Sequence, residues 1–156
     1  MCVNLPITIL AATPDDAGEL MTVQRAAYLS QGRIHNSFEL PALTETLEQV
    51  RAAVACGGVF KALLGARIVG TVRARIDGDT CHIGRLAVAP DMQGTGLGSR
   101  LLAEVEARFG AEAKRFELFT GPMSARNVEL YHRLGYREIP PPEGAPDLIF
   151  MEKFTA

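Results

Sequence analysis

Cysteine is scarce in this chain: its 156 residues include three, Cys2, Cys56 and Cys81, which are odd in number and far apart. Such a set argues against a disulfide framework and against a zinc cluster, and it is typical of a protein kept in a reducing compartment. We therefore expect a cytoplasmic protein that holds no metal.

An excess of either charge is also missing, because 16 Lys and Arg residues stand against 18 Asp and Glu. Nucleic-acid-binding proteins usually carry a basic excess on one face, so no nucleic-acid partner is expected. No apolar run reaches the length of a membrane span, and the N-terminal residues lack the basic leader and apolar core of a signal peptide. Internal repeats and low-complexity segments are absent too, and the length suits one domain over residues 1–156.

Strand and helix signals alternate along the chain. Residues 68–76, for example, show the period of two that indicates a strand. Strands are predicted at 7–12, 59–64, 68–76, 81–88, 116–120, 136–139 and 148–154, helices at 13–28, 43–54, 97–109 and 124–134, and an irregular segment at 30–41. This order predicts a single α/β domain in which about four helices flank a mixed, mostly antiparallel, twisted sheet.

The segment from the predicted strand end at Val88 to the following helix is the most informative part of the sequence. Three alternate glycines, Gly94, Gly96 and Gly98, open that amphipathic helix. Glycine lets the backbone take positive φ and approach a ligand closely. A helix start adds unpaired N–H groups and the positive end of a dipole. The segment is therefore predicted to bind an anion, most naturally a phosphate or pyrophosphate.

Two common phosphate-binding motifs do not fit this segment. The dinucleotide fingerprint needs G-x-G-x-x-G directly after a strand, whereas here residues 89–93 intervene and the spacing is G-x-G-x-G. A Walker A loop needs a lysine followed by Ser or Thr, which the segment lacks.

Two blocks of the sequence together resemble a known family. Gln93, Gly96 and Gly98 fill the fixed positions of Q/R-x-x-G-x-G/A, the acyl-CoA-binding motif of the GNAT superfamily of N-acyltransferases. The predicted helix with Asn127 and Tyr131 resembles the second block of that family and follows in the expected order. The resemblance implies a GNAT-like fold and an N-acetyltransferase that passes an acetyl group from acetyl-CoA to a primary amine by direct attack in a ternary complex. Dimers are common among similar proteins, which allows a homodimer here.

The resemblance also implies which residues contact the coenzyme. They are Leu86, Ala87, Val88, Gln93, Gly94, Thr95, Gly96, Leu97, Gly98, Ser99, Asn127 and Tyr131. In this comparison the glycine loop binds the pyrophosphate, and a backbone N–H of the strand ending at Val88 polarises the thioester. Asn127 contacts the pantetheine arm, and Tyr131, on the same helix face, is the general acid that protonates the sulfur. A thiol has a pKa of about 8.5 against about 10 for tyrosine, so the acid should add only about 10²-fold in rate.

The base that must deprotonate the amine is less defined. His82 lies six residues before Val88, and an even offset on a regular strand places both side chains on one face. Histidine also titrates in the required range. Glu117, on the following predicted strand, is a second candidate, and a chain of water molecules is a third. None of the cysteines has a paired base, so no acyl-cysteine step is expected.

The acceptor is implied to lie between the first two helices and the loop before the last strand. Candidate residues there are Tyr28, His35, Phe38 and Glu39, together with the proline-rich loop 140–146. Arg73 and Arg75 could meet an acidic acceptor, although such arginines more often pair with acids or reach solvent. The acceptor would be a small-molecule or peptide amine. Two alternatives stay open: another acyl-CoA as donor, or a non-catalytic module that senses CoA, because no acid stands at position 82.

Overall fold

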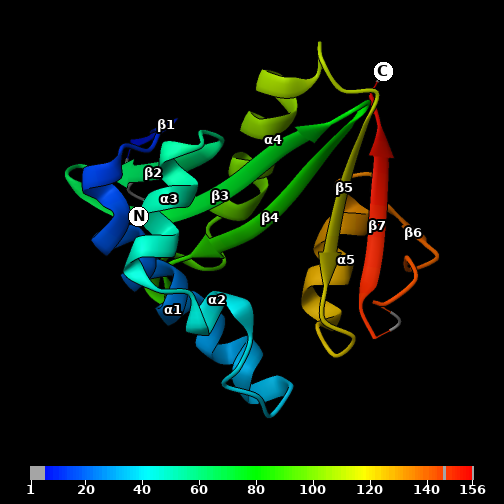
Figure 1. Ribbon diagram of the computed structural model, residues 1–156, viewed down its shortest axis with the longest axis horizontal. Coiled ribbons are helices and arrows are strands. Elements are labelled where there is room, and N and C mark those ends of the chain that lie inside the picture. Colours follow the sequence, from blue (N-terminus) through cyan, green and yellow to red (C-terminus); the bar gives the residue numbers. More distant parts are fainter. Residues whose placement is uncertain (1–5, 146, 156) are drawn as a thin grey trace.

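The computed structural model describes residues 6–145 and 147–155, and the strands found in them form a single seven-stranded sheet in the order β1-β2-β3-β4-β5-β7-β6 (Figure 1). The strands are β1 (Ile7–Ala11), β2 (Val59–Leu64), β3 (Arg67–Asp77), β4 (Thr80–Val88), β5 (Arg115–Thr120), β6 (Arg137–Ile139) and β7 (Ile149–Phe154). β4 and β5 are parallel, and the other neighbouring pairs are antiparallel. The predicted mixed, mostly antiparallel sheet is thus confirmed.

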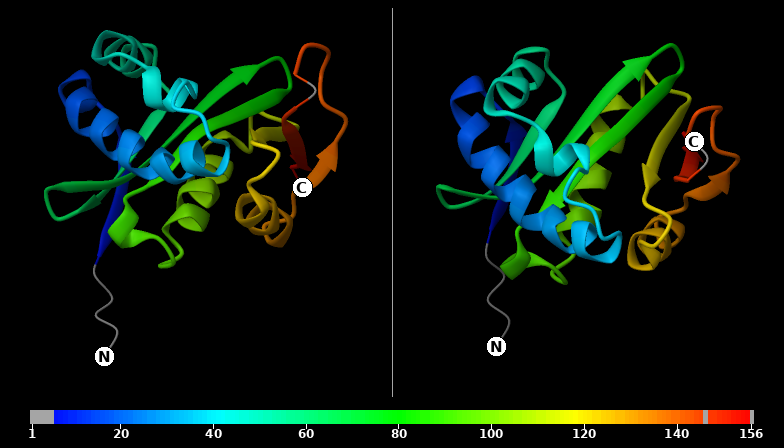
Figure 2. Two further views of the ribbon diagram at one scale, coloured as in Figure 1. Left: turned by 90° about the horizontal axis from the view of Figure 1, so that it is seen from below. Right: turned by 60° about the horizontal axis from the view of Figure 1, so that its bottom comes forward.

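Helices cover both faces of the sheet. They are α1 (Ala17–Ile34), α2 (Pro41–Thr44), α3 (Leu47–Ala55), α4 (Leu97–Phe109) and α5 (Ala125–Arg133), with 3₁₀ turns at η1 (Pro14–Asp16) and η2 (Pro90–Met92). α1 to α3 lie on one face and α4 on the other (Figure 2). None of the helices in the described ranges is both long enough and apolar enough to cross a membrane.

The core includes the side of α4 that packs on the sheet. Leu101, Leu102 and Val105 of this helix are fully buried. A Cβ at Gly70 of β3 would lie 3.0 Å from a Leu101 methyl and 3.3 Å from a Leu97 methyl. The glycine therefore lets α4 sit directly on β3, which fixes the start of this helix beside the end of β4.

β4 and β5 are paired along only part of their length. Their register joins Thr80 to Arg115, Cys81 to Phe116 and His82 to Glu117, and no further pair follows. Beyond these residues the two strands diverge like the arms of a V (Figure 1). The divergence opens the sheet at its centre.

A β-bulge interrupts β4 at the same place. Arg73 of β3 pairs with Gly84 and Thr71 pairs with Ala87, so β4 carries one more residue than its partner between these pairs. Arg85, in the bulge, has a φ of 49°. The extra residue reverses the alternation of faces, and the prediction that His82 and Val88 share a face is therefore wrong.

The first two predicted helices also differ from the structure. α1 continues to Ile34, into the first part of the segment expected to be irregular, and Gly32 packs there where a Cβ would lie 2.9 Å from the carbonyl oxygen of Ser37. The helix predicted at 43–54 is divided into α2 and α3. Thr46 starts α3 with a capping box, in which its hydroxyl accepts from the N–H of Gln49 and the Gln49 side chain accepts from the N–H of Thr46.

Candidate active site

The loop between β4 and α4 is held by its own side chains. The Gln93 amide donates to the carbonyl oxygen of Val88 at 3.1 Å, and the Thr95 hydroxyl donates to the carbonyl oxygen of Met92 at 2.6 Å. These bonds fix the loop to the end of the strand.

The three glycines of this loop differ in what they require. Gly94 has a φ of 79° and Gly96 a φ of 86°, which side chains with a Cβ rarely adopt. A Cβ added at either would meet nothing within 4 Å, so the loop faces open space. Gly98 has no positive φ, and its Cβ would lie 3.9 Å from Val88 and 4.0 Å from Leu130, which is ordinary contact.

The start of α4 offers free backbone donors. Its first intrahelical bond from the cap runs from the N–H of Arg100 to the carbonyl of Gly96, at 3.1 Å, so the N–H groups of residues 97–99 precede the regular ladder. No described side chain caps this end, and its first turn has no acidic residue. Such an end binds anions through N–H groups and the helix dipole.

A narrow hollow, here called the wedge, lies between β4 and β5, and about 250 Å³ of empty space can be assigned to it when the open solvent at its mouth is included. It is lined by Tyr28, Ile83, Gly84, Arg85, Leu86, Leu102, Leu118, Phe119 and Tyr131. Tyr28 comes from α1 on one face of the sheet, whereas Leu102 and Tyr131 come from α4 and α5. The wedge is therefore lined by residues from both faces of the sheet.

Tyr131 is the titratable group on the α5 side of the wedge. It is 6% exposed, and its ring packs edge-on against Tyr136 with centroids 6.2 Å apart. Burial raises the pKa of Tyr131 well above the usual 10.0, and the nearby Tyr28 raises it further. The phenol consequently keeps its proton at neutral pH. One turn earlier, Asn127 donates to the Thr120 hydroxyl at 3.2 Å, which fixes α5 to the end of β5.

His82 and Glu117 are neighbours across the β4–β5 pairing, at the closed end of the V. Neither lines the wedge. The Glu117 carboxylate makes an ion pair with Arg115 at 2.8 Å. In the β3 register His82 lies opposite Arg75, on the face that carries Arg73 and Thr71, which is the face covered by α1. Their role as bases stays a prediction.

The residues expected at the acceptor side are separated in the structure. Tyr28 lines the wedge. The Nδ1 of His35 bonds the carbonyl of Gln31 at 2.9 Å and its Nε2 accepts from the N–H of Met123 at 3.2 Å, so this ring joins α1 to the loop before α5. Phe38, 66% exposed, and Glu39 are on the outer loop after α1 and do not line the wedge.

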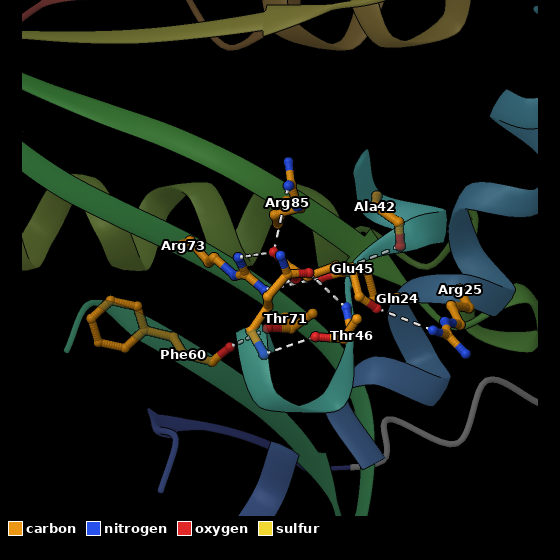
Figure 3. A network of polar contacts seen from close by, with 10 residues as sticks. Gln24, Arg25, Ala42, Glu45, Thr46, Phe60, Thr71, Arg73 and Arg85 are labelled. Atoms are coloured by element: carbon orange, nitrogen blue, oxygen red, sulfur yellow. Dashed lines mark hydrogen bonds and ion pairs between the residues drawn. The ribbon is translucent and has the colours of Figure 1, made fainter. Parts of the chain in front are cut away.

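The sequence did not single out a cluster centred on Glu45 (Figure 3). The Glu45 carboxylate accepts two hydrogen bonds from Arg73 and one, at 3.2 Å, from Gln24, and the Arg85 guanidinium lies 3.6 Å away. Burial raises the pKa of Glu45, but the Arg73 and Gln24 hydrogen bonds and both arginine charges outweigh it and lower the pKa below 4.5. Arg73 thus pairs with an acid, as such arginines commonly do, and Arg75 is exposed. One signal was available, since Arg85 is the single charged residue in the run 83–89.

Comparison with known proteins agrees with this geometry. The acetyltransferase (GNAT) family model matches residues 24–136, which include the glycine loop and α5. No curated protein matches the sequence.

Solved structures with a similar fold include three acetyltransferases. The PaiA N-acetyltransferase of Thermoplasma acidophilum, solved with coenzyme A, has a TM-score of 0.79 and 16% identity over 96% of this chain and 99% of its own. An acetyltransferase of Thermus thermophilus has a TM-score of 0.74 and 23% identity, over 96% of this chain and 97% of its own. The ribosomal-protein-S18-alanine N-acetyltransferase of Escherichia coli has a TM-score of 0.76 and 18% identity, over 97% of this chain and 95% of its own. These likenesses concern the fold, whereas the family model covers most of the sequence, and the chain belongs to the acetyltransferase (GNAT) family.

Proposed function

We propose that this chain transfers the acetyl group of acetyl-CoA, the donor used by its family, to a primary amine by direct attack in a ternary complex. The observation that carries this proposal is the position of two features at one strand end. The uncapped start of α4 is joined to the end of β4 by the glycine loop, and the same strand separates from β5 to open the wedge. A single acetyl-CoA molecule would place its diphosphate at the start of α4 and its thioester in the wedge.

The residues of the loop fit such a donor. A Cβ at Gly94 or Gly96 would meet nothing within 4 Å, so this side of the loop is open. The backbone of the two glycines could therefore come close to a diphosphate. The N–H groups of residues 97–99 provide donors for its oxygens. Leu86, Ala87 and Val88 would border the thioester arm, and Asn127 the pantetheine.

Backbone N–H groups of β4 would polarise the thioester. Beyond His82 the edge of β4 that faces β5 has no strand partner, so its donors are available to a ligand in the wedge. A donor aimed at a developing oxyanion is typically worth about 10²- to 10³-fold in rate. The bulge at Arg85 sets the direction of these donors, because it changes the twist of the strand.

When acetyl-CoA is bound it supplies an activated acyl group: the amine nitrogen bonds to the thioester carbon, the carbon–sulfur bond breaks, and an amide and the CoA thiol are the products. Tyr131 gives its phenolic proton to the leaving sulfur, and it regains one from the proton that the amine nitrogen releases. Tyr131 holds its proton at neutral pH, which this role requires. Before attack, His82 or Glu117 would accept one proton from the ammonium form of the acceptor, and since neither lines the wedge, a water molecule would carry that proton to them. The second proton, released by the nitrogen after attack, is the one that restores Tyr131.

Thiol release with acetyl-CoA and a panel of primary amines tests the proposal. We expect release that depends on the amine, and saturable uptake of acetyl-CoA in calorimetry. A folded protein that takes up neither CoA nor acetyl-CoA at millimolar concentration would overturn it. Uptake without turnover on any amine would instead indicate a CoA-sensing module. Propionyl-CoA and butyryl-CoA, run beside acetyl-CoA, test the preference for the short acyl chain.

A further inference from the structure

The guanidinium of Arg85 lies between two hollows. One is the wedge, and the other is an open groove between β4 and the α2–α3 segment. The groove is lined by Pro41, Thr44, Glu45, Gln49 and Arg85. Within these linings Arg85 is the residue that belongs to both, so a ligand that reaches the wedge from the groove must pass it.

The hydrogen-bonding capacity of Arg85 is largely unused. A guanidinium carries five N–H donors. In the described residues its one ionic contact is with Glu45, at 3.6 Å, and it makes no hydrogen bond. Its Nε is buried and has no partner among the described atoms. A buried, charged donor of this kind is stabilised by an anion.

Glu45 does not meet that need. Its two oxygens already accept hydrogen bonds from Arg73 and Gln24. Two guanidinium groups, each about a quarter exposed or less, therefore share one carboxylate, and the cluster retains one positive charge (Figure 3). This charge lies at the mouth of the wedge in a chain whose formal net charge is -2.

The backbone of Arg85 is held in an uncommon conformation. Its φ of 49° is in the left-handed region, and the bulge supplies the extra residue that allows it. Strained residues of this kind cluster at ligand-binding sites, because the surrounding structure must compensate for them. The strain and the unused donors thus occur in one residue that two hollows share.

We propose that the acceptor is an amine that also carries a carboxylate, and that Arg85 binds this carboxylate while the amine enters the wedge near Tyr131. The planar guanidinium fork matches the two oxygens of a carboxylate. This inference rests on the proposed acetyl transfer, since it names the class of acceptor. It excludes simple alkylamines as preferred acceptors.

The experiment compares each of the standard L-amino acids with its α-carboxamide, and β-alanine and 4-aminobutyrate with theirs, in the thiol-release assay. We expect kcat/KM to favour at least one acid over its amide by about 10- to 100-fold, the range of a charge-assisted hydrogen bond. Arg85→Gln should abolish that preference, so that each acid and its amide react with equal kcat/KM. Arg75→Gln, which removes an exposed charge from the adjacent strand, is the matched control and should behave as the wild type.

Folding and function are controlled separately. Arg85→Asn is a second variant, because asparagine tolerates positive φ and the fold should survive. Calorimetry with acetyl-CoA on wild type, Arg85→Gln and Arg85→Asn checks that both variants are folded and still bind the donor. An acid preference that persists in both Arg85 variants, or a wild type that prefers the amides, overturns the inference while acetyl transfer stands.

Loss of the proposed function has a different signature. If no amine releases thiol, acetyl transfer fails, and the same acids are then titrated by calorimetry into protein that contains CoA. Saturable binding that Arg85→Gln removes supports the carboxylate site. No binding of any acid to the wild type overturns it.

Discussion

Gln93 and Val88 are joined across the start of the glycine loop, where the side-chain amide of Gln93 donates to the carbonyl oxygen of Val88 at 3.1 Å. The bond links the end of β4, at the wedge, to the loop that precedes α4. This hydrogen bond therefore supports both the proposed thioester site and the proposed diphosphate site. Changes at Gln93 should alter coenzyme binding more than they alter folding.

Gln93→Ala should raise the Kd for acetyl-CoA by about 5- to 10-fold, which corresponds to the loss of one hydrogen bond of about 1 kcal/mol. The side chain is exposed, so the melting temperature should change little. Isothermal titration calorimetry and thermal unfolding measure the two quantities. Gln93→Arg retains N–H donors and should restore affinity, whereas Gln93→Glu, which can only accept, should not. An alanine variant with wild-type affinity would show that the Gln93–Val88 hydrogen bond does not support coenzyme binding.

Alanine at Gly96 and at Gly98 should have opposite effects on stability. Gly96 has a φ of 86°, so Gly96→Ala should cost about 1–2 kcal/mol of unfolding free energy. Gly98 lies in the first turn of α4 with room for a Cβ, and Gly98→Ala should be neutral or stabilising by up to about 1 kcal/mol.

Both variants should nevertheless bind acetyl-CoA more weakly, because the added methyl group crowds the proposed diphosphate site. Urea unfolding and calorimetry on the same samples separate the two effects. If Gly98→Ala is as stable as predicted and binds like the wild type, the diphosphate does not lie against residues 96–99.

Local signals in the sequence were sufficient for most of the fold. Alternating residues in β3 and the glycines after β4 each act within a few residues, and the strand and the loop appear as predicted. The position of Gly96 as the N-cap of α4 is equally local, since its φ and the cap depend on adjacent residues. The capping box of Thr46 and Gln49 is a local signal too, and it marks the start of α3 and so the division of the predicted second helix.

Long-range contacts account for most of the differences. The bulge at Arg85 depends on the register with β3, which no pattern within β4 displays. The extension of α1 is accompanied by packing of Gly32 against the turn that leads into α2. Glu45 becomes a site residue only because Arg73 and Arg85 reach it from two strands. For the bulge and for Glu45 the deciding partner is more than ten residues away in sequence, whereas Gly32 packs against Ser37 and Leu43, just after α1.

Tyr131→Phe should lower kcat by about 10²-fold and leave the Kd for acetyl-CoA nearly unchanged, because it removes a proton donor and little contact area. Tyr136→Phe is a matched control. Tyr136 is also buried and packs against Tyr131, but its hydroxyl is buried with no hydrogen-bond partner in the described residues. Its removal should leave kcat unchanged and the protein at least as stable. Equal kcat values for wild type and Tyr131→Phe would exclude Tyr131 as the acid.

The Glu45 cluster should make stability depend on pH in a defined direction. The pKa of Glu45 is lowered in the folded state, so the unfolded chain takes up this proton first as pH falls below 4.5. The stabilisation from the carboxylate is then present above pH 4.5 and is lost as pH falls through the folded pKa. Glu45→Gln should therefore reduce the free energy of unfolding by about 1–3 kcal/mol at pH 7.

The gap between Glu45→Gln and the wild type should narrow steadily below pH 4.5, because the wild-type carboxyl then loses its charge as well. Urea unfolding at pH 7, 5, 4 and 3 measures this. Glu48→Gln, in an exposed pair with Arg51 at 3.8 Å, controls for the loss of a surface charge and should change stability at pH 7 by less than about 0.5 kcal/mol. A gap that stays constant from pH 7 to pH 3 would show that packing of the side chain, and not its charge between Arg73 and Arg85, stabilises this junction.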